Sequence, residues 1–138
     1  MNFYTHKYHA KPTTVAGIRF ASKGEAERYL FLREEQKAGR IRDLRLQVAY
    51  PILPAHWTMR IGAKGKPVRD RLALSAVSYV ADFVYLTAEG VEVVEDFKGM
   101  ETPEFKMKEA LVYDRYGVRL SKPKRPCAPA VPCYLEFD

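Results

Sequence analysis

The sequence lacks the features that mark secreted and membrane proteins. Its 138 residues include only two cysteines, Cys127 and Cys133, and two thiols alone cannot complete a structural zinc site. No apolar run approaches the ~18 residues that a membrane-spanning helix needs. Residues 1–11 are polar and basic, whereas a secretory signal would have an apolar stretch there. We therefore expect a cytoplasmic protein with no membrane partner, in which both cysteines are free thiols.

The composition is that of an ordinary globular domain. Hydrophobic residues make up 47% and charged residues 29% of the chain, which argues against disorder. The length predicts one domain, which we place at residues 1–121 with a basic N-terminal arm, followed by a proline-rich basic tail at 122–138. The net charge of +6 favours an anionic partner without identifying it.

Helix and strand signals alternate along the chain. Ser22 and Glu25 have the spacing of a capping box for a helix over 26–38, and Thr102 is the expected cap of a second helix over 104–116. Strands are predicted over 41–53, 72–86, 91–97 and 118–120. This order of elements predicts an α/β domain with a central mixed sheet.

Residues 60–71 are predicted to form a basic loop. The segment contains five cations and a single acid, Asp70, and so has a net charge of +4. Two interpretations stay open, a solvated hairpin tip and a phosphate-binding surface. For the neighbouring Trp57, core packing is favoured over stacking on a base.

Carboxylates interrupt the apolar hairpin predicted around residues 88–90. A three-residue loop with Gly90 in the left-handed position places Asp82 opposite Asp96, whereas a four-residue loop places Glu95 there. Either register brings two carboxylates within about 5 Å at their Cβ atoms, where like charges repel. A divalent cation would remove the repulsion, and oxygen ligands alone favour Mg²⁺ or Mn²⁺.

The spacing of these residues resembles a known signature. Asp82, 13 intervening residues and then Asp96-x-Lys98 resemble the motif of the PD-(D/E)XK nuclease superfamily, with Ala81 in place of the usual proline. Over about residues 3–120, the chain also resembles a family of small phage- and prophage-encoded proteins that is assigned to this superfamily and was long of unknown function. Four blocks carry the second resemblance: residues 17–26, 39–47, 79–83 and 94–99.

The resemblance implies a fold and a set of metal ligands. The fold would be the restriction-endonuclease-like core, in the order helix, three strands, helix and strand, around a central mixed sheet. Asp82 and Asp96 would be the metal-binding carboxylates, and the backbone carbonyl of Phe97 would be a further ligand. Lys98 would orient or activate the attacking water, although pairing with Asp96 alone would also explain it.

The acid on the first helix is less certain than those of the hairpin. The resemblance implies that Glu25 completes the acidic cluster, by direct or water-mediated metal binding. Its position three residues after Ser22 is explained equally by a helix cap. Glu27 is a rival acid on the same helix, and it lies about 200° around the axis from Glu25, so only one of them can face the site.

These observations predict a Mg²⁺- or Mn²⁺-dependent DNA endonuclease, encoded by a phage and active in the host cytoplasm. We expect a homodimer that cleaves branched or Holliday-junction DNA and uses no small-molecule organic cofactor. The alternative is an inactive nuclease-fold module that binds DNA or a host protein. The candidate nucleic-acid-binding residues are Gln47, Arg60, Lys64, Lys66, Arg69, Arg71, Lys106 and Lys108.

Overall fold

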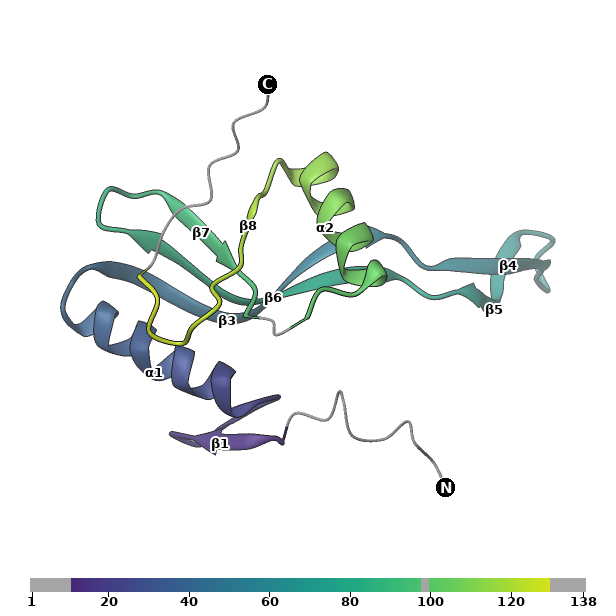
Figure 1. Ribbon diagram of the computed structural model, residues 1–138. Coiled ribbons are helices and arrows are strands. Elements are labelled where there is room, and N and C mark those ends of the chain that lie inside the picture. Colours follow the sequence, from purple (N-terminus) through teal and green to yellow (C-terminus); the bar gives the residue numbers. More distant parts are fainter. Residues whose placement is uncertain (1–10, 98–99, 130–138) are drawn as a thin grey trace.

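A four-stranded mixed sheet forms the centre of the molecule (Figure 1). The computed structural model describes residues 11–97 and 100–129. Neighbouring strands are antiparallel except for the last pair, which is parallel and connected through the second helix. In sheet order the strands are β3 (Ile41–Leu53), β6 (Val77–Thr87), β7 (Glu92–Glu95) and β8 (Leu120–Ser121). The predicted mixed α/β architecture is therefore confirmed.

Both helices begin at the predicted caps. Helix α1 (Lys23–Lys37) follows Ser22, whose hydroxyl accepts a hydrogen bond from the Glu25 N–H at 3.1 Å. Helix α2 (Pro103–Tyr116) follows Thr102, which accepts from the N–H of a residue in the first turn. It ends at Gly117, whose φ of 66° is a left-handed conformation that glycine adopts without steric cost.

The two helices cover opposite faces of the sheet. Val93 packs in a cluster with Ala26 and Leu32 of α1, whereas the next residue, Val94, packs in a cluster with Val112 of α2. Successive residues of a strand point to opposite faces, so the sheet separates two cores. Figure 1 shows α1 below the sheet and α2 above it.

Strands β3 and β6 exchange faces halfway along their length. Leu46 packs with the α1 core but Val48 with the α2 core, and on β6 Phe83 and Ala81 differ in the same way. Between Leu46 and Val48 lies Gln47, whose φ of 52° is left-handed and uncommon for any residue other than glycine. Because of this reversal, one half of the β3–β6 pair packs against the α1 core and the other half against the α2 core.

Two hairpins lie outside the central sheet. The first joins β1 (Thr13–Val15) and β2 (Ile18–Phe20) and packs on α1, where the rings of Phe20 and Tyr29 lie 5.1 Å apart. The second joins β4 (His56–Ile61) and β5 (Pro67–Leu74). This β4–β5 ribbon projects away from the sheet (Figure 1), and each of its strand residues is exposed.

The ribbon corrects two predictions. Residues 60–71 are not one loop, because strands occupy most of the segment and only residues 62–66 lie between them. Trp57 is not a core residue, because it is 40% exposed on β4. The loop was inferred from basic residues and glycines, and a ribbon exposed on both faces has no buried side whose pattern would reveal its strands.

The expectations about thiols and membranes are tested in part. Cys127 is an exposed free cysteine, as predicted, whereas Cys133 lies outside the described residues. Within residues 11–97 and 100–129, no helix combines the length and the apolar character needed to cross a membrane.

Candidate functional site

The hairpin between β6 and β7 has the predicted three-residue loop. The Thr87 N–H donates to the Val91 carbonyl at 2.8 Å, and Gly90 has a φ of 82°. The ladder pairs Phe83 with Glu95, so the next positions in the same register are Asp82 and Asp96. This register confirms the prediction that Asp82 lies opposite Asp96 and excludes the four-residue alternative.

Asp82 is fixed next to the end of β7. Its Oδ2 atom accepts a hydrogen bond from the Phe97 N–H at 2.9 Å. The phenyl ring of Phe97 packs against Gly24 at the start of α1, so closely that a Cβ added to this glycine would lie 2.6 Å from the ring. A side chain at position 24 would therefore push the end of β7 away from α1.

Gln47, on β3, lies near two of the predicted acids, Glu25 and Asp82. Because Leu46 pairs with Phe83 and Val48 with Ala81, Gln47 lies opposite Asp82 on the other side of β6. Its Nε2 atom donates to Glu25 Oε1 at 3.3 Å. Gln47, one of two left-handed residues of β3 together with Asp43, therefore contacts Glu25 and lies opposite Asp82, and backbone outliers of this kind are concentrated at functional sites.

Glu25, rather than Glu27, is the helix acid that faces the sheet. Glu25 is 6% exposed, whereas the Glu27 side chain is 48% exposed and lies 3.8 Å from Lys23 on the outer surface of α1. The backbone N–H of Glu25 also donates to the cap hydroxyl of Ser22. The capping role and the site role therefore coexist, because one uses the backbone and the other the side chain.

Asp96 is held by a buried tyrosine that sequence reasoning missed. The Tyr79 hydroxyl donates to Asp96 Oδ2 at 2.5 Å, and the Asp96 N–H donates to the Ser121 carbonyl at 2.9 Å. Burial, with the hydrogen bond and charge of Asp96, raises the pKa of Tyr79 well above its ordinary value. The phenol therefore remains a proton donor to Asp96 throughout the neutral range.

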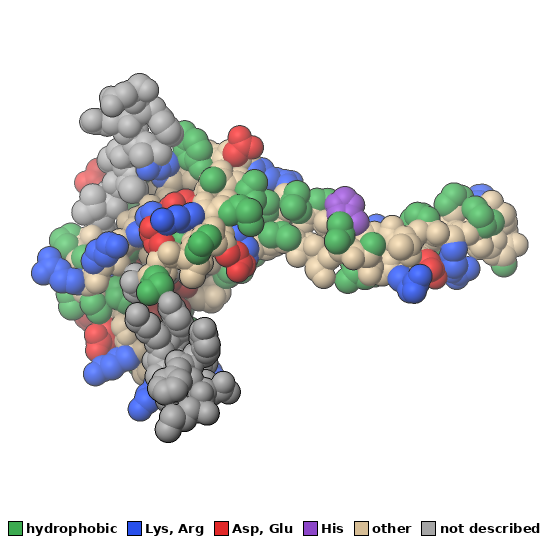
Figure 2. Space-filling model, turned by 45° about the vertical axis from the view of Figure 1, so that its right-hand side comes forward, with side chains coloured by type: hydrophobic (Ala, Val, Ile, Leu, Met, Phe, Trp, Pro, Cys, Tyr) green, Lys and Arg blue, Asp and Glu red, His purple; other side chains and the backbone are tan. Residues whose placement is uncertain are grey.

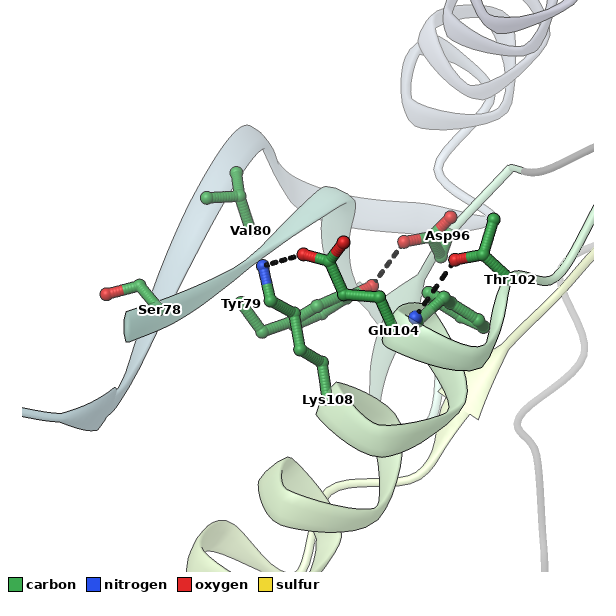
Figure 3. A pocket seen from close by; sticks show the side chains of 8 residues that line it. Ser78, Tyr79, Val80, Asp96, Thr102, Glu104 and Lys108 are labelled. Atoms are coloured by element: carbon green, nitrogen blue, oxygen red, sulfur yellow. Dashed lines mark hydrogen bonds and ion pairs between the residues drawn. The ribbon is translucent and has the colours of Figure 1, made fainter. Parts of the chain in front are cut away.

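A pocket of about 320 Å³ opens beside Asp96 at the start of α2 (Figure 3). Lys108 lies in its wall and pairs with Glu104 at 3.4 Å. The contact of Lys108 with a phosphate stays a prediction. The lining residues are Ser78, Tyr79, Val80, Asp96, Thr102, Glu104, Phe105 and Lys108.

Glu95 belongs to a separate network on the α1 face. Its carboxylate accepts two hydrogen bonds from Arg28, at 2.5 and 2.8 Å, and one from the Tyr85 hydroxyl at 2.6 Å. Burial alone would lower the pKa of Arg28, but the hydrogen bond and charge of Glu95 outweigh it and raise that pKa. Glu95 is therefore a structural acid that faces away from the row of Asp82 and Asp96.

Apart from Lys98, the remaining predicted residues lie away from Asp82 and Asp96. Lys98 lies outside the described residues, and Lys106 is exposed on α2. The five cations of the basic segment lie on the β4–β5 ribbon, which projects from the sheet (Figure 2). They are Arg60 on β4, Lys64 and Lys66 in the turn, and Arg69 and Arg71 on β5.

A family model described as "Protein of unknown function (DUF1064)" matches residues 5–125 of the chain. The chain belongs to this family. The matched span includes α1, the whole central sheet, α2 and the β4–β5 ribbon. Neither a curated protein nor a solved structure matches the chain.

The acids of this DUF1064 chain suit a small oxygen-coordinated cation. Within the described residues, no group of three or more His, Cys, Asp and Glu side chains is arranged to hold a metal ion. Mg²⁺ is usually bound through one or two carboxylates together with waters and substrate phosphates. Asp82, in the middle of β6, and Asp96, directly after β7, provide such a pair, and the backbone carbonyl of Phe97 adds an oxygen of the same chemical type.

Proposed function

We propose that the protein is a Mg²⁺- or Mn²⁺-dependent DNA endonuclease with the restriction-endonuclease-like fold of the PD-(D/E)XK superfamily. The observation that carries the proposal is the β6–β7 register, which pairs Phe83 with Glu95 and so places Asp82 and Asp96 at the next positions. Glu25 accepts a hydrogen bond from Gln47, which lies on the strand next to Asp82. The order α1, β3, β6, β7, α2 and β8 agrees with the core of helix, three strands, helix and strand that the superfamily implies.

Asp82 and Asp96 would hold the cation, with the Phe97 carbonyl, and Glu25 would complete the acidic cluster. A bound divalent cation supplies charge neutralisation on the scissile phosphate and lowers the pKa of water. The chain keeps these ligands in place. Tyr79 fixes one oxygen of Asp96, the Phe97 N–H fixes one oxygen of Asp82, and Gln47 orients Glu25.

Lys98 would orient the attacking water and stabilise the charge that develops on the phosphate. This role rests on the spacing Asp96-x-Lys98 in the sequence. We further propose that the substrate is branched DNA, such as a Holliday junction, and that two copies act together. Resolution of a junction requires a cut in each of two strands, and a homodimer provides one catalytic centre for each cut.

The proposal is tested by cleavage of duplex, nicked and four-way-junction DNA in Mg²⁺ and Mn²⁺. We expect Asp96→Asn and Asp82→Asn to reduce cleavage by about a hundredfold or more, because the cation contributes several kcal/mol of transition-state stabilisation. Glu25→Gln should also reduce cleavage. Glu27→Gln removes an acid from the outer surface of the same helix and should cleave like the wild type.

Two results would oppose the proposal in different ways. A wild-type protein that is inert on each DNA with each metal would contradict the enzyme. If that inert protein also bound DNA without taking up Mn²⁺ in calorimetry, the result would favour the alternative hypothesis of an inactive DNA-binding module over the endonuclease. A junction-cleaving protein that stays monomeric with and without DNA would contradict only the homodimer.

A further inference from the structure

The β4–β5 ribbon extends well beyond the body of the molecule. Strand β5 contains 8 residues, which at about 3.3 Å per residue span about 26 Å. Figures 1 and 2 show the ribbon projecting from the side of the sheet as a narrow extension. The proposed metal site at Asp82 and Asp96 does not need a ribbon of this length. We therefore expect the ribbon to have a separate function.

The ribbon has a strong positive charge that begins at Arg60 and Arg71 and extends to its tip. Its five cations and one acid give +4 over residues 60–71. Asp70 lies between two of the arginines, 3.6 Å from Arg60 and 3.7 Å from Arg71. Lys64 and Lys66 flank Gly65 in the turn, so the tip itself is basic.

The ribbon also exposes large apolar side chains. Trp57 is 40%, Met59 58% and Ile61 68% exposed. The Arg69 guanidinium lies over the Trp57 ring at 5.7 Å from its centroid. Exposed apolar side chains gathered in one place mark a surface that binds a partner. The partner must therefore offer both negative charge and apolar contact.

We propose that the ribbon lies in the major groove of a duplex segment that flanks the cleaved phosphate. The inference rests on the proposed function, since it takes DNA as the substrate. Two strands about 4.8 Å apart, with their side chains, fit the major groove, which is about 12 Å wide and admits a two-stranded ribbon. The cations contact the phosphates along the groove, and Trp57, Met59 and Ile61 contact base edges.

The charge favours DNA over a second copy of the chain. Two ribbons packed against each other would bring together two segments of +4, and like charges at close range repel. Phosphates instead provide the opposite charge at regular intervals. The flank that the ribbon needs follows from its length: about 26 Å corresponds to roughly 8 base pairs at 3.4 Å per base pair.

The experiment measures binding of the full chain to fluorescein-labelled duplex DNA by anisotropy in EDTA, over a series of salt concentrations. Lys64→Ala/Lys66→Ala should reduce the slope of log affinity against log salt by about 2, because each lost phosphate contact removes about 0.9. The control, Lys37→Ala/Arg40→Ala, removes the same charge from the end of α1 and should keep the wild-type slope. Trp57→Ala should weaken binding with little change in slope.

A second measurement uses duplexes of decreasing length. Wild-type affinity should fall once the flank is shorter than about 8 base pairs, whereas the Lys64→Ala/Lys66→Ala variant should depend less on length. Equal salt slopes for the tip variant and its control would overturn the inference. So would light scattering that shows Trp57→Ala converting a dimer into a monomer, because that would assign the ribbon to a second copy.

These outcomes separate the inference from the proposed function. If DNA binding depends on the ribbon but the protein cuts no DNA, the proposed nuclease function is contradicted and the groove contact of the ribbon is supported. A protein that cuts DNA with binding independent of Lys64, Lys66 and Trp57 contradicts the groove contact and leaves the nuclease.

Discussion

Glu95 and Asp96 are neighbours in the chain and both are buried, yet their surroundings differ. Glu95, on the α1 face, is enclosed by Arg28 and Tyr85. Asp96, on the α2 face, accepts from the neutral hydroxyl of Tyr79 and lines a pocket. A buried carboxylate needs a partner, and the two acids at the end of β7 have different ones: a cation for Glu95 and a neutral hydroxyl for Asp96. One face of the strand uses its acid to hold elements together, and the other presents its acid to a cavity.

The Arg28 network also reaches the C-terminal segment. The Nη1 atom of Arg28 donates to the carbonyl of Pro126 at 3.0 Å and to that of Ala128. One buried guanidinium therefore links α1, β7 and the segment after β8. The comparison predicts that a change on the Glu95 side damages the fold, whereas a change on the Asp96 side damages the site.

The largest expected effect is on stability and concerns Arg28→Met. This change leaves Glu95 buried without its cation and should lower the free energy of unfolding by about 3–5 kcal/mol, measured by urea denaturation with circular dichroism. Asp96→Asn is the matched variant on the other face. It should lower the free energy of unfolding much less, because Tyr79 can still donate to the amide oxygen.

A double variant sharpens this test. Arg28→Met/Glu95→Leu removes both charges, so it should recover much of the stability that Arg28→Met alone loses. If Arg28→Met and Asp96→Asn lost the same stability, the distinction between a structural acid and a site acid would fail.

The parts of the site that the sequence predicts are those set by local rules. Gly90 determines the loop length, the loop length determines the register, and the register places Asp82 opposite Asp96. Likewise, Ser22 marks the start of α1, and helix geometry then shows that only one of Glu25 and Glu27 can face the sheet. Each of these steps involves residues close in sequence or a known turn geometry, so each could be argued without coordinates.

The parts that sequence reasoning missed depend on distant contacts. Arg28 and Glu95 are 67 positions apart, and no local pattern announces their pairing. Tyr79 is one of many aromatic residues in an apolar strand until the fold places its hydroxyl against Asp96. The ribbon was predicted only in part: the hairpin tip was one of two open interpretations, but the extent of its strands was missed, because strands exposed on both faces lack the alternation of buried and exposed residues by which strands are predicted.

The next effect in size concerns metal binding and uses the two tyrosines of β6. Tyr79→Phe removes the hydrogen bond that orients Asp96, and loss of such a supporting contact costs about 10–100-fold in metal affinity. Mn²⁺ titration by calorimetry measures it. Tyr85→Phe removes the matching hydroxyl from Glu95 on the other face and should leave Mn²⁺ affinity unchanged. An equal loss in both variants would show that the effect is general destabilisation.

A further effect concerns alkaline pH and is small near neutral pH. Burial is the main cause that raises the pKa of both Tyr79 and Tyr85 in the folded state, whereas the unfolded chain titrates near pH 10. Above about pH 10 the folded protein therefore holds protons that the unfolded chain releases. Stability is complete below that pH and falls as pH rises, by about 1.4 kcal/mol per pH unit for each tyrosine.

Urea denaturation between pH 9 and 11.5 measures this slope. Tyr79→Phe and Tyr85→Phe should each remove about half of it, and the double variant should remove nearly all of the tyrosine contribution. Asp96→Asn should change only the contribution of Tyr79 to this slope. The variant loses the charge that helps raise the pKa of Tyr79, whereas Glu95 still faces Tyr85. If Asp96→Asn altered both shares, the two faces of β7 would be electrostatically coupled, and the separation of the two acids would be incomplete.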